Sequence, residues 1–229
     1  MDNNYWVDFW KNYTTDVLEK DEQSQVLRTF DKKPITDELW GFTLNKIDEV
    51  FNVNEGDNVL DLCCGNGLLS KHYNNKGAKV TAVDVSSALL DNISKIDGIT
   101  AINSDIRSLN FENNSFEKVI LYAGIQYLND KESIELIQNI YNWLKPNGCL
   151  FIGDVPDVKK RWDFYNTEER QAVYFNNQLE GKAIVGHWFE KDWFDKLTNF
   201  IGFNEGIYHA QDDKLIYSIF RFDYLYKKQ

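Results

Sequence analysis

The sequence lacks the features of a membrane-bound or secreted protein. No run of about eighteen apolar residues is present that could cross a bilayer. The segment at the start, MDNNYWVDFW, contains neither the basic part nor the apolar part of a secretory signal. We therefore expect a cytoplasmic protein that has no membrane partner.

Cysteine and basic residues are also scarce. The 3 cysteines, Cys63, Cys64 and Cys149, form neither a disulfide framework nor a metal-ligand spacing, so the sequence predicts no disulfide and no metal site. The 25 Lys and Arg residues are scattered among 36 Asp and Glu residues, which gives a formal net charge of -11. This charge repels phosphate backbones and disfavours nucleic acid as a partner.

What the chain does contain fits one globular domain. Its 229 residues are 43% hydrophobic and 27% charged, which is ordinary usage for a protein with a single core. Aromatic residues make up 15% of the chain, and many of them lie near its two ends. These ends are therefore candidates for building a substrate pocket.

After residue 54, short apolar segments alternate with helical ones. Lys131 to Leu144 has apolar residues at helical spacing and ends before the turn Lys145-Pro146-Asn147-Gly148. The expected strands are Asn58 to Leu62, Lys79 to Asp84, Ile99 to Ser104, Lys118 to Tyr122 and Cys149 to Asp154. This alternation predicts βαβ units and a parallel sheet.

Further segments flank this core on both sides. Amphipathic helices are expected over Tyr5 to Leu18 and over Thr36 to Phe51, the second with Thr36 as its N-cap. After a polar, aromatic insert we expect a helix over Glu190 to Ile201 and strands around Glu205 to His209 and Leu215 to Phe222. The prediction is one domain, 1–229, with N-terminal helices (1–54), a core (55–154), an insert (155–188) and a last helix with strands (189–229).

A turn with two glycines follows the first strand of the core. Asp61 lies at the end of this strand, and Gly65 and Gly67 lie in the turn that leads into the next helix. Glycine permits a positive φ and lets backbone amides approach a ligand closely. We therefore expect a ligand at the carboxyl edge of the sheet, where doubly wound folds bind nucleotides. A tight turn without a ligand is the alternative.

Two further acids follow the next strands. Asp84 ends the second strand, where a carboxylate can accept both hydroxyl groups of a ribose. Asp105 follows the third strand and could accept from the amine of adenine while Ile106 packs on the ring. Taken alone, Asp105 would suit a solvated turn equally well. The acids together predict a nucleoside cofactor.

The glycine turn does not fit a dinucleotide. The dinucleotide fingerprint G-x-G-x-x-G has a third glycine where this chain has Ser70, and its helix N-terminus receives a pyrophosphate. Here Asp61 precedes the loop, and an acid suits a cationic ligand better than a phosphate. S-adenosylmethionine carries an ammonium and a sulfonium group and no phosphate. A dehydrogenase is accordingly disfavoured.

The motifs together resemble those of the class I S-adenosylmethionine-dependent methyltransferases. They are VLDLCCGNG, VDVSSALL, SDI, NSFEKVILYAGIQYL and LKPNGCLFI, between Asn58 and Asp154. The resemblance implies a Rossmann-like α/β fold with a seven-stranded, mostly parallel sheet, helices on both faces, an antiparallel last strand and S-adenosyl-L-methionine as cofactor. One departure is Cys63, which stands where many relatives have the first glycine of the loop.

The resemblance also implies the cofactor residues. Asp61, Gly65 and Gly67 would line the methionine part, Asp84 would bind the ribose, and the backbone near Ala123 would lie against the methionine. The complete predicted set is Asp61, Cys63, Gly65, Gly67, Asp84, Val85, Asp105, Ile106, Tyr122 and Ala123.

The acceptor residues are sought outside these motifs. Methyl transfer requires alignment of the acceptor with the methyl group, and a general base only where an oxygen is methylated. His187 follows the insert and is the candidate base, with a helix-capping or surface role as the alternative. The predicted substrate-binding residues are Tyr13, Gln126, Tyr127, Asp154, Arg161 and Trp188.

Each of these residues is chosen for its position. Gln126 and Tyr127 follow the fourth strand, and Asp154 ends the fifth. Arg161 could hold a phosphate or carboxylate in a bidentate contact, or lie solvated in a loop. Tyr13 belongs to an aromatic stripe with Trp6, Phe9 and Trp10 that could close as an N-terminal lid or pack on the sheet.

The last third of the chain carries a second, weaker resemblance. IGDVPD, EGKAIVGHWFEKDW and YSIFRFDYL look like segments of methyltransferases from bacterial surface-polysaccharide pathways. They favour a sugar, a sugar phosphate or an amino alcohol phosphate as the small-molecule acceptor. A quinone precursor, an amine or a carboxylate is the alternative acceptor, and a non-catalytic cofactor-binding protein is the alternative class. The sequence leaves a homodimer open.

Overall fold

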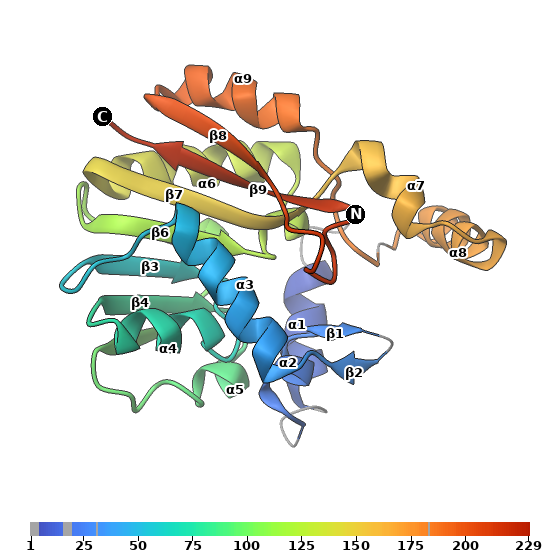
Figure 1. Ribbon diagram of the computed structural model, residues 1–229, viewed down its shortest axis with the longest axis horizontal. Coiled ribbons are helices and arrows are strands. Elements are labelled where there is room, and N and C mark those ends of the chain that lie inside the picture. Colours follow the sequence, from blue (N-terminus) through green and yellow to red (C-terminus); the bar gives the residue numbers. More distant parts are fainter. Residues whose placement is uncertain (1–4, 16–19, 31, 183) are drawn as a thin grey trace.

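The computed structural model describes residues 5–15, 20–30, 32–182 and 184–229. Its centre is a seven-stranded sheet in the order β5-β4-β3-β6-β7-β9-β8, with helices on both faces (Figure 1). The strands are β3 (Asn58–Leu62), β4 (Lys79–Asp84), β5 (Ile99–Asn103), β6 (Phe116–Tyr122), β7 (Leu144–Pro156), β8 (Glu205–Ala210) and β9 (Arg221–Lys227). The predicted Rossmann-like sheet is thereby confirmed.

The direction of the strands also agrees with the prediction. The pairs that join β5, β4, β3, β6 and β7 are parallel. β9 is inserted between β7 and β8 and runs antiparallel to both. The strand expected over 215–222 is wrong for residues 215–220, which form successive turns in which the amide of Ser218 donates to the carbonyl of Leu215 and the amide of Phe220 to that of Tyr217. The strand begins only at Arg221.

Helices cover the two faces of this sheet because its strands are apolar on both sides. Val59 packs in one buried cluster with α3 (Asp37–Val50) and α4 (Leu68–Asn75), and its neighbour Leu60 packs in the other with α6 (Asp130–Trp143) and α9 (Lys191–Ile201). Successive side chains of a strand point to opposite faces, so one segment serves both clusters. The short helix α5 (Ser87–Leu90) follows β4.

Several helices begin where the sequence places a capping residue. The hydroxyl of Thr36 accepts from the amide of Leu39 at 3.2 Å and caps α3, as predicted. Asn129 and Glu132 form a capping box at the start of α6. Each such pair satisfies backbone amides that have no partner within the helix.

No helix in the described ranges is long and apolar enough to span a bilayer.

The N-terminal segments lie at the carboxyl ends of the strands. α1 (Tyr5–Thr15) contacts α5, and α2 (Glu22–Gln25) leads into a small antiparallel hairpin of β1 (Thr29–Phe30) and β2 (Lys33–Pro34). The helix predicted to reach Leu18 is described only to Thr15, and residues 16–18 lie outside the described ranges.

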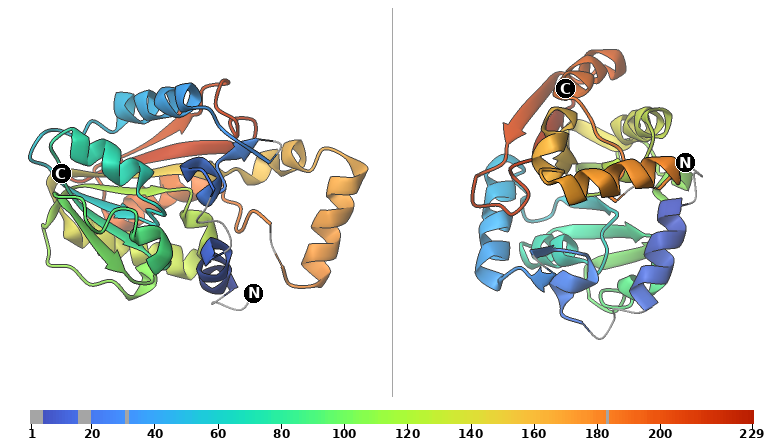
Figure 2. Two further views of the ribbon diagram at one scale, coloured as in Figure 1. Left: turned by 90° about the horizontal axis from the view of Figure 1, so that it is seen from below. Right: turned by 90° about the vertical axis from the view of Figure 1, so that its right-hand side faces the viewer.

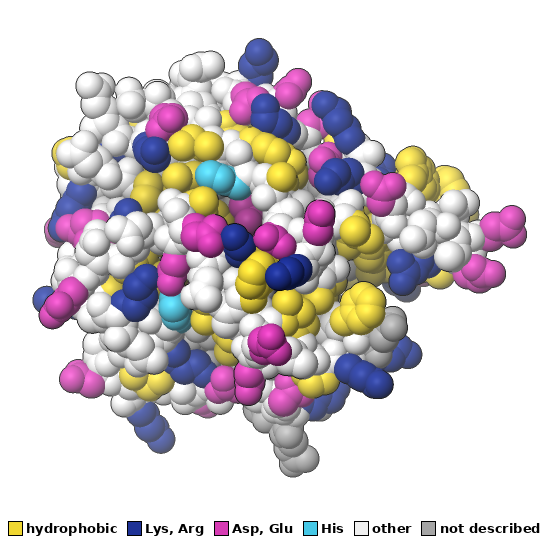
Figure 3. All heavy atoms as spheres, in the orientation of Figure 1, with side chains coloured by type: hydrophobic (Ala, Val, Ile, Leu, Met, Phe, Trp, Pro, Cys, Tyr) yellow, Lys and Arg dark blue, Asp and Glu magenta, His cyan; other side chains and the backbone are white. Residues whose placement is uncertain are grey.

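The insert after β7 forms a protruding arm. It contains η3 (Val158–Lys160), α7 (Arg161–Phe164) and α8 (Glu168–Leu179). α8 stands away from the sheet in Figure 1 and in the left view of Figure 2. The short 3-10 helices η1 (Ile106–Ser108) and η2 (Ile125–Tyr127) follow β5 and β6. Acidic and basic side chains are interspersed on the face shown in Figure 3, without a basic stripe.

Candidate functional site: two adjoining cavities

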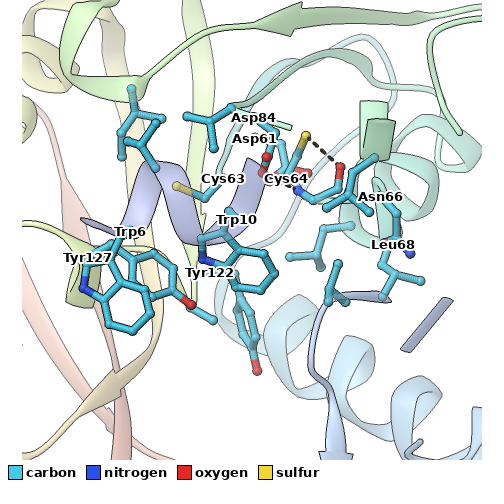
Figure 4. Close-up of a pocket in the computed structure, with 18 of the residues that line it drawn as sticks. Trp6, Trp10, Asp61, Cys63, Cys64, Asn66, Leu68, Asp84, Tyr122 and Tyr127 are labelled. Atoms are coloured by element: carbon cyan, nitrogen blue, oxygen red, sulfur yellow. Dashed lines mark hydrogen bonds between the residues drawn. The ribbon is translucent and has the colours of Figure 1, made fainter. Parts of the chain in front are cut away.

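A pocket lies at the carboxyl ends of β3, β4 and β6. We call it the first cavity. All of the predicted cofactor residues except Gly67 line it, together with residues of α1, α3 and the segment between α2 and β1. Figure 4 shows the carboxyl groups of Asp61 and Asp84 close together, and the rings of Trp6, Trp10 and Tyr127 on another side of the pocket. The first cavity is therefore acidic at its base and aromatic at its wall.

Gly67 corrects the prediction, because it does not line this cavity. It is the N-cap of α4 and has a φ of 77°. A Cβ atom built on it would lie 2.4 Å from Cγ2 of Ile93. Glycine is needed there for the left-handed turn and for the close packing of Ile93, not for the approach of a ligand.

The backbone around the first cavity is strained at two residues other than glycine. Cys63 has a φ of 56° and Ala123 a φ of 54°. A residue with a side chain adopts this left-handed region at a cost of about 1–2 kcal/mol. Such strain is characteristic of functional sites. Cys63 stands where many relatives have glycine, and glycine would adopt this backbone conformation without strain.

Asp61 and Asp84 are both buried at the ends of their strands. Burial raises the pKa of Asp61 to about 7, although its carboxylate accepts from the hydroxyl of Ser70 at 2.6 Å. Burial also raises the pKa of Asp84, whose carboxylate accepts from the amides of Gly65 at 2.8 Å and Ser86 at 2.9 Å. Two acids held this way favour a ligand that brings a positive charge and hydroxyl donors.

Asp105 is held differently. Although burial raises its pKa, the hydrogen bonds from Arg107 outweigh this and leave the pKa lowered. Nε of Arg107 lies 3.0 Å from both carboxylate oxygens, and Nη1 of the same side chain lies 2.9 Å from Glu132 of α6. Asp105 is therefore ionised and fixed, and with its neighbour Ile106 it lines the first cavity.

Several residues that line the first cavity are not among the predicted site residues. They are Val7, Val26, Arg28, Trp40, Cys64, Asn66, Leu68, Leu69, Leu89, Arg107 and Leu128. Trp6 and Trp10, which belong to the aromatic stripe, and Tyr127, a predicted acceptor contact, also line it. Arg28 gives no signal in the sequence, because nothing in the local sequence shows that the segment before β1 folds back onto the sheet.

A second cavity of about 430 Å³ adjoins the first. It is lined by Gln126, Tyr127, Arg161, His187 and Trp188, which are among the candidate acceptor-site residues, and by further residues of α8. The two cavities share Trp6, Tyr127 and Leu128, which form the wall between them. Its size lies within the range of small-molecule sites, roughly 300 to 1,000 Å³.

Polar groups in the second cavity have unused hydrogen-bonding capacity. Among the described residues, Nε of Arg161 and Oε1 of Gln126 are buried and have no partner, although Arg161 also donates to the hydroxyl of Tyr174 at 3.1 Å. Nε2 of His187 lies 3.0 Å from Oδ1 of Asp130, and its amide donates to the carbonyl of Gln126 at 2.7 Å. A buried polar group without a partner calls for an explanation, and a bound water, ion or ligand is one such explanation.

Two predicted substrate residues line neither cavity. Asp154 is buried, lies 3.2 Å from Nη1 of Arg221 and accepts from Gln211. A register shift between Ile152 and Val155, with a φ of 61° at Asp154, turns this side chain toward β9. Tyr13 donates to the carbonyl of Ser24 and stacks on Phe9. Both are corrections to the sequence prediction.

Comparisons with known proteins agree with this fold. Residues 59–148 match the family described as methyltransferase domain. The chain is 34% identical over 123 residues to a demethylmenaquinone methyltransferase of Chlamydia pneumoniae, covering 51% of this chain and 52% of that protein. It is 30% identical over 161 residues to a carboxy-S-adenosyl-L-methionine synthase of Shewanella sediminis, covering 65% and 63%. The chain thus spans less than two thirds of the length of these relatives.

Solved structures give the same result at low identity. A phosphoethanolamine N-methyltransferase of Haemonchus contortus, in complex with phosphoethanolamine and S-adenosylhomocysteine, has a TM-score of 0.72 and 14% identity, and the likeness covers 99% of this chain and 50% of that one. A putative methyltransferase of Haloferax volcanii, in complex with an activator, has a TM-score of 0.66 and 15% identity, covering 96% and 98%. At these identities the likeness shows the fold alone.

Proposed function

We propose that this chain, whose residues 59–148 match the methyltransferase domain family, is a class I methyltransferase that transfers a methyl group from S-adenosylmethionine to a small acceptor. The observation that carries the proposal is the pair of adjoining cavities. The first cavity has acids that could bind an adenosine with a cationic tail. The second cavity has polar groups that could bind an acceptor. Tyr127 and Trp6 stand where the two would meet.

The carboxylates of the first cavity, which accept hydrogen bonds, fit the polar groups of S-adenosylmethionine. Asp61 would accept from the ammonium group, Asp84 from the ribose hydroxyls, and Asp105 from the adenine amine beside Ile106. The carboxylate oxygens of Asp84 each accept one amide and retain capacity for a further bond. When bound, the cofactor supplies a methyl group on a positively charged sulfur.

The residues of this chain then align and shield the acceptor. Alignment in an intramolecular geometry corresponds to an effective molarity of about 10⁵ to 10⁸ M, so positioning alone can carry much of the rate. Trp6, Tyr127 and Leu128 form an apolar boundary that keeps water away from the transfer. Where the acceptor is a hydroxyl, His187 takes its proton, with Asp130 orienting the ring.

The acceptor proposed is a small molecule that carries an acidic group. Arg161, with its buried Nε, supports an anion at one end of the second cavity, and Oε1 of Gln126 supports an N–H or O–H donor near the wall. These two groups favour an amino alcohol phosphate or a sugar phosphate. A quinone precursor, a simple amine or a carboxylate is the alternative, and curated relatives include a phosphoethanolamine N-methyltransferase of Plasmodium falciparum as well as quinone methyltransferases.

We also propose that the protein acts in the cytoplasm, because all 3 cysteines are free.

Calorimetry tests the cofactor. The purified chain is titrated with S-adenosylmethionine, S-adenosylhomocysteine and NAD, and we expect the first two to bind more tightly. Tighter binding of NAD would overturn the proposal. Transfer of a labelled methyl group into a panel of phosphorylated amines and alcohols then separates an enzyme from a protein that only binds the cofactor.

Paired variants test the acceptor site. Arg161→Ala is expected to raise KM for an anionic acceptor by about 10- to 100-fold, the scale of a charged hydrogen bond. His187→Ala is expected to lower kcat on a hydroxyl acceptor by about 10²- to 10⁴-fold. Affinity for S-adenosylhomocysteine should stay near wild type in both. Arg170→Ala and His72→Ala, which change residues outside both cavities, are the controls, and full turnover by the first pair would place the acceptor elsewhere.

A further inference from the structure

Arg28 is a cation in the first cavity that the cofactor motifs do not explain. It precedes β1, far in sequence from the core strands, yet Arg28 lines the first cavity, as Asp61 does. Its guanidinium carbon lies 4.4 Å from the ring centroid of Tyr122 and 4.6 Å from that of Trp40. Apart from a hydrogen bond to the Tyr122 side chain, stacking on rings leaves the N–H groups at the edge of the guanidinium plane available to a ligand.

The charge of Arg28 is not neutralised by an ion pair in the described part of the chain. No carboxylate oxygen there lies within 4.0 Å of its nitrogen atoms. The other arginine that lines the first cavity, Arg107, is bonded to Asp105 and Glu132. Burial raises the pKa of Asp61, and the charge of Arg28 acts on that pKa in the opposite direction. Asp61 and Arg28 therefore both line the first cavity, and they do not form an ion pair with each other.

The backbone on both sides of Arg28 is fixed. Its amide donates to the carbonyl of Gln23 at 2.8 Å, and its carbonyl accepts from the amide of Ile35 at 3.1 Å. The hydroxyl of Tyr217, from the turns before β9, lies 2.9 Å from the carbonyl of Thr29 and 3.3 Å from that of Leu27. Leu27 has a φ of 58°, a strained conformation that these bonds maintain. Such fixation is typical of a side chain that must be placed accurately.

We propose that Arg28 binds the carboxylate of the amino-acid end of the cofactor, opposite the ammonium site at Asp61. The inference rests on the proposed function. An α-amino acid carries one charge of each sign, and among the residues that line the first cavity Arg28 is the cation that no carboxylate of the described chain holds. Bidentate pairing with a carboxylate is the contact for which a guanidinium is suited. Tyr217 is a positioning residue for it.

Binding of two related ligands tests the proposal. S-adenosylhomocysteine has the amino-acid group, and 5′-methylthioadenosine lacks it. In Arg28→Gln the Kd for S-adenosylhomocysteine is expected to rise by about 10- to 100-fold, while the Kd for 5′-methylthioadenosine changes by less than about twofold. Lys33→Gln, which removes an exposed charge from the same hairpin, should leave both values unchanged.

A second variant separates anchoring from folding. Tyr217→Phe keeps Arg28 but removes the hydroxyl that holds its neighbours, so it should weaken S-adenosylhomocysteine selectively and by less than Arg28→Gln. Equal loss of both ligands in Arg28→Gln, or no loss of either, overturns the proposal. If the wild-type chain binds neither ligand, the proposed cofactor itself is wrong, and this result is distinct from a failure at Arg28 alone.

Discussion

At the scale of single residues, the first cavity depends on acids placed at the ends of neighbouring strands. Asp61 ends β3 next to Asp84 at the end of β4, because parallel strands in register bring their carboxyl ends to one edge. Each acid is buried: Asp61 accepts from Ser70 of α4, and Asp84 accepts from the amide of Gly65 in the turn between β3 and α4. Burial and these bonds act in opposite directions on the two pKa values.

Asp84→Ala is predicted to weaken binding of S-adenosylhomocysteine by roughly 1.5 to 3 kcal/mol, since hydrogen bonds to a charged group are lost. Calorimetry on the folded variant measures this. Asp91→Ala removes an exposed acid shortly after α5 and serves as the control. An unchanged affinity for Asp84→Ala would remove this residue from the ribose site.

The affinity for the cofactor is predicted to depend on pH through Asp61. Because its pKa in the fold is raised to about 7, the carboxyl is increasingly protonated below that pH and binds an ammonium poorly. S-adenosylhomocysteine should therefore bind more tightly as pH rises from about 6 to 8, with release of protons at the lower end. Titrations in buffers of different ionisation enthalpy detect this release. Asp61→Asn should flatten the profile, and an unchanged profile would exclude Asp61 as its origin.

The same group acts on stability with the opposite sign. Burial favours the neutral form of Asp61 in the fold, so its contribution to the free energy of unfolding is present below its ordinary pKa. That contribution is lost as pH rises through about 7. Binding and stability at this residue therefore have different pH optima, a conflict that is common where an ionised group serves a ligand.

At the scale of elements, the junctions between strands and helices control the site. The turn from β3 into α4 contains two glycines with positive φ, and α3 contains a third glycine, Gly41, inside the helix. A Cβ atom on Gly41 would meet nothing within 4 Å, whereas one on Gly67 would collide with Ile93. The same residue type therefore serves different purposes in the two elements.

Gly67→Ala and Gly41→Ala are predicted to change stability in opposite directions. Gly67→Ala should lower the free energy of unfolding by about 1 to 3 kcal/mol, because it adds a left-handed strain and an overpacked contact. Gly41→Ala should raise it by about 0.5 to 1 kcal/mol, because alanine loses less entropy in a helix. Urea unfolding of the two variants compares them directly. A loss of stability of similar size in both would contradict this account.

At the scale of the whole molecule, both cavities are assembled from distant parts of the chain. The wall between them combines Trp6 of α1 with Tyr127 after β6, and the ring centroids of these two residues lie 4.6 Å apart. The far side of the second cavity comes from the arm that carries α8. A ligand in the first cavity therefore contacts α1, which packs on the site from outside the sheet.

Cofactor binding is predicted to slow amide hydrogen exchange in α1. Trp6, Val7 and Trp10 line the first cavity, so a ligand there adds contacts that oppose local opening of the helix. Exchange measured by mass spectrometry, with and without S-adenosylhomocysteine, tests this. α9 lines neither cavity and is the internal control. Equal exchange in α1 with and without the ligand would show that this helix is not a lid.

The sequence by itself determined the parallel core and the acids at its edge. β3 and β4 have the predicted bounds, and the other core strands differ from prediction at their ends, because a buried strand and its flanking turn are encoded locally. Most of the predicted cofactor residues line the first cavity for the same reason, since each one ends or follows a strand.

Only the tertiary structure decided which other side chains reach the site. The sequence predicts that Asp154 ends the fifth core strand, but β7 continues to Pro156, and a register shift against β9 turns the Asp154 side chain away from both cavities. Arg28 enters the first cavity because Tyr217, close to the other end of the chain, holds the carbonyls beside it. A side chain's direction at a strand end depends on one residue of register, and the position of a loop depends on contacts with remote segments. Local sequence patterns contain neither quantity.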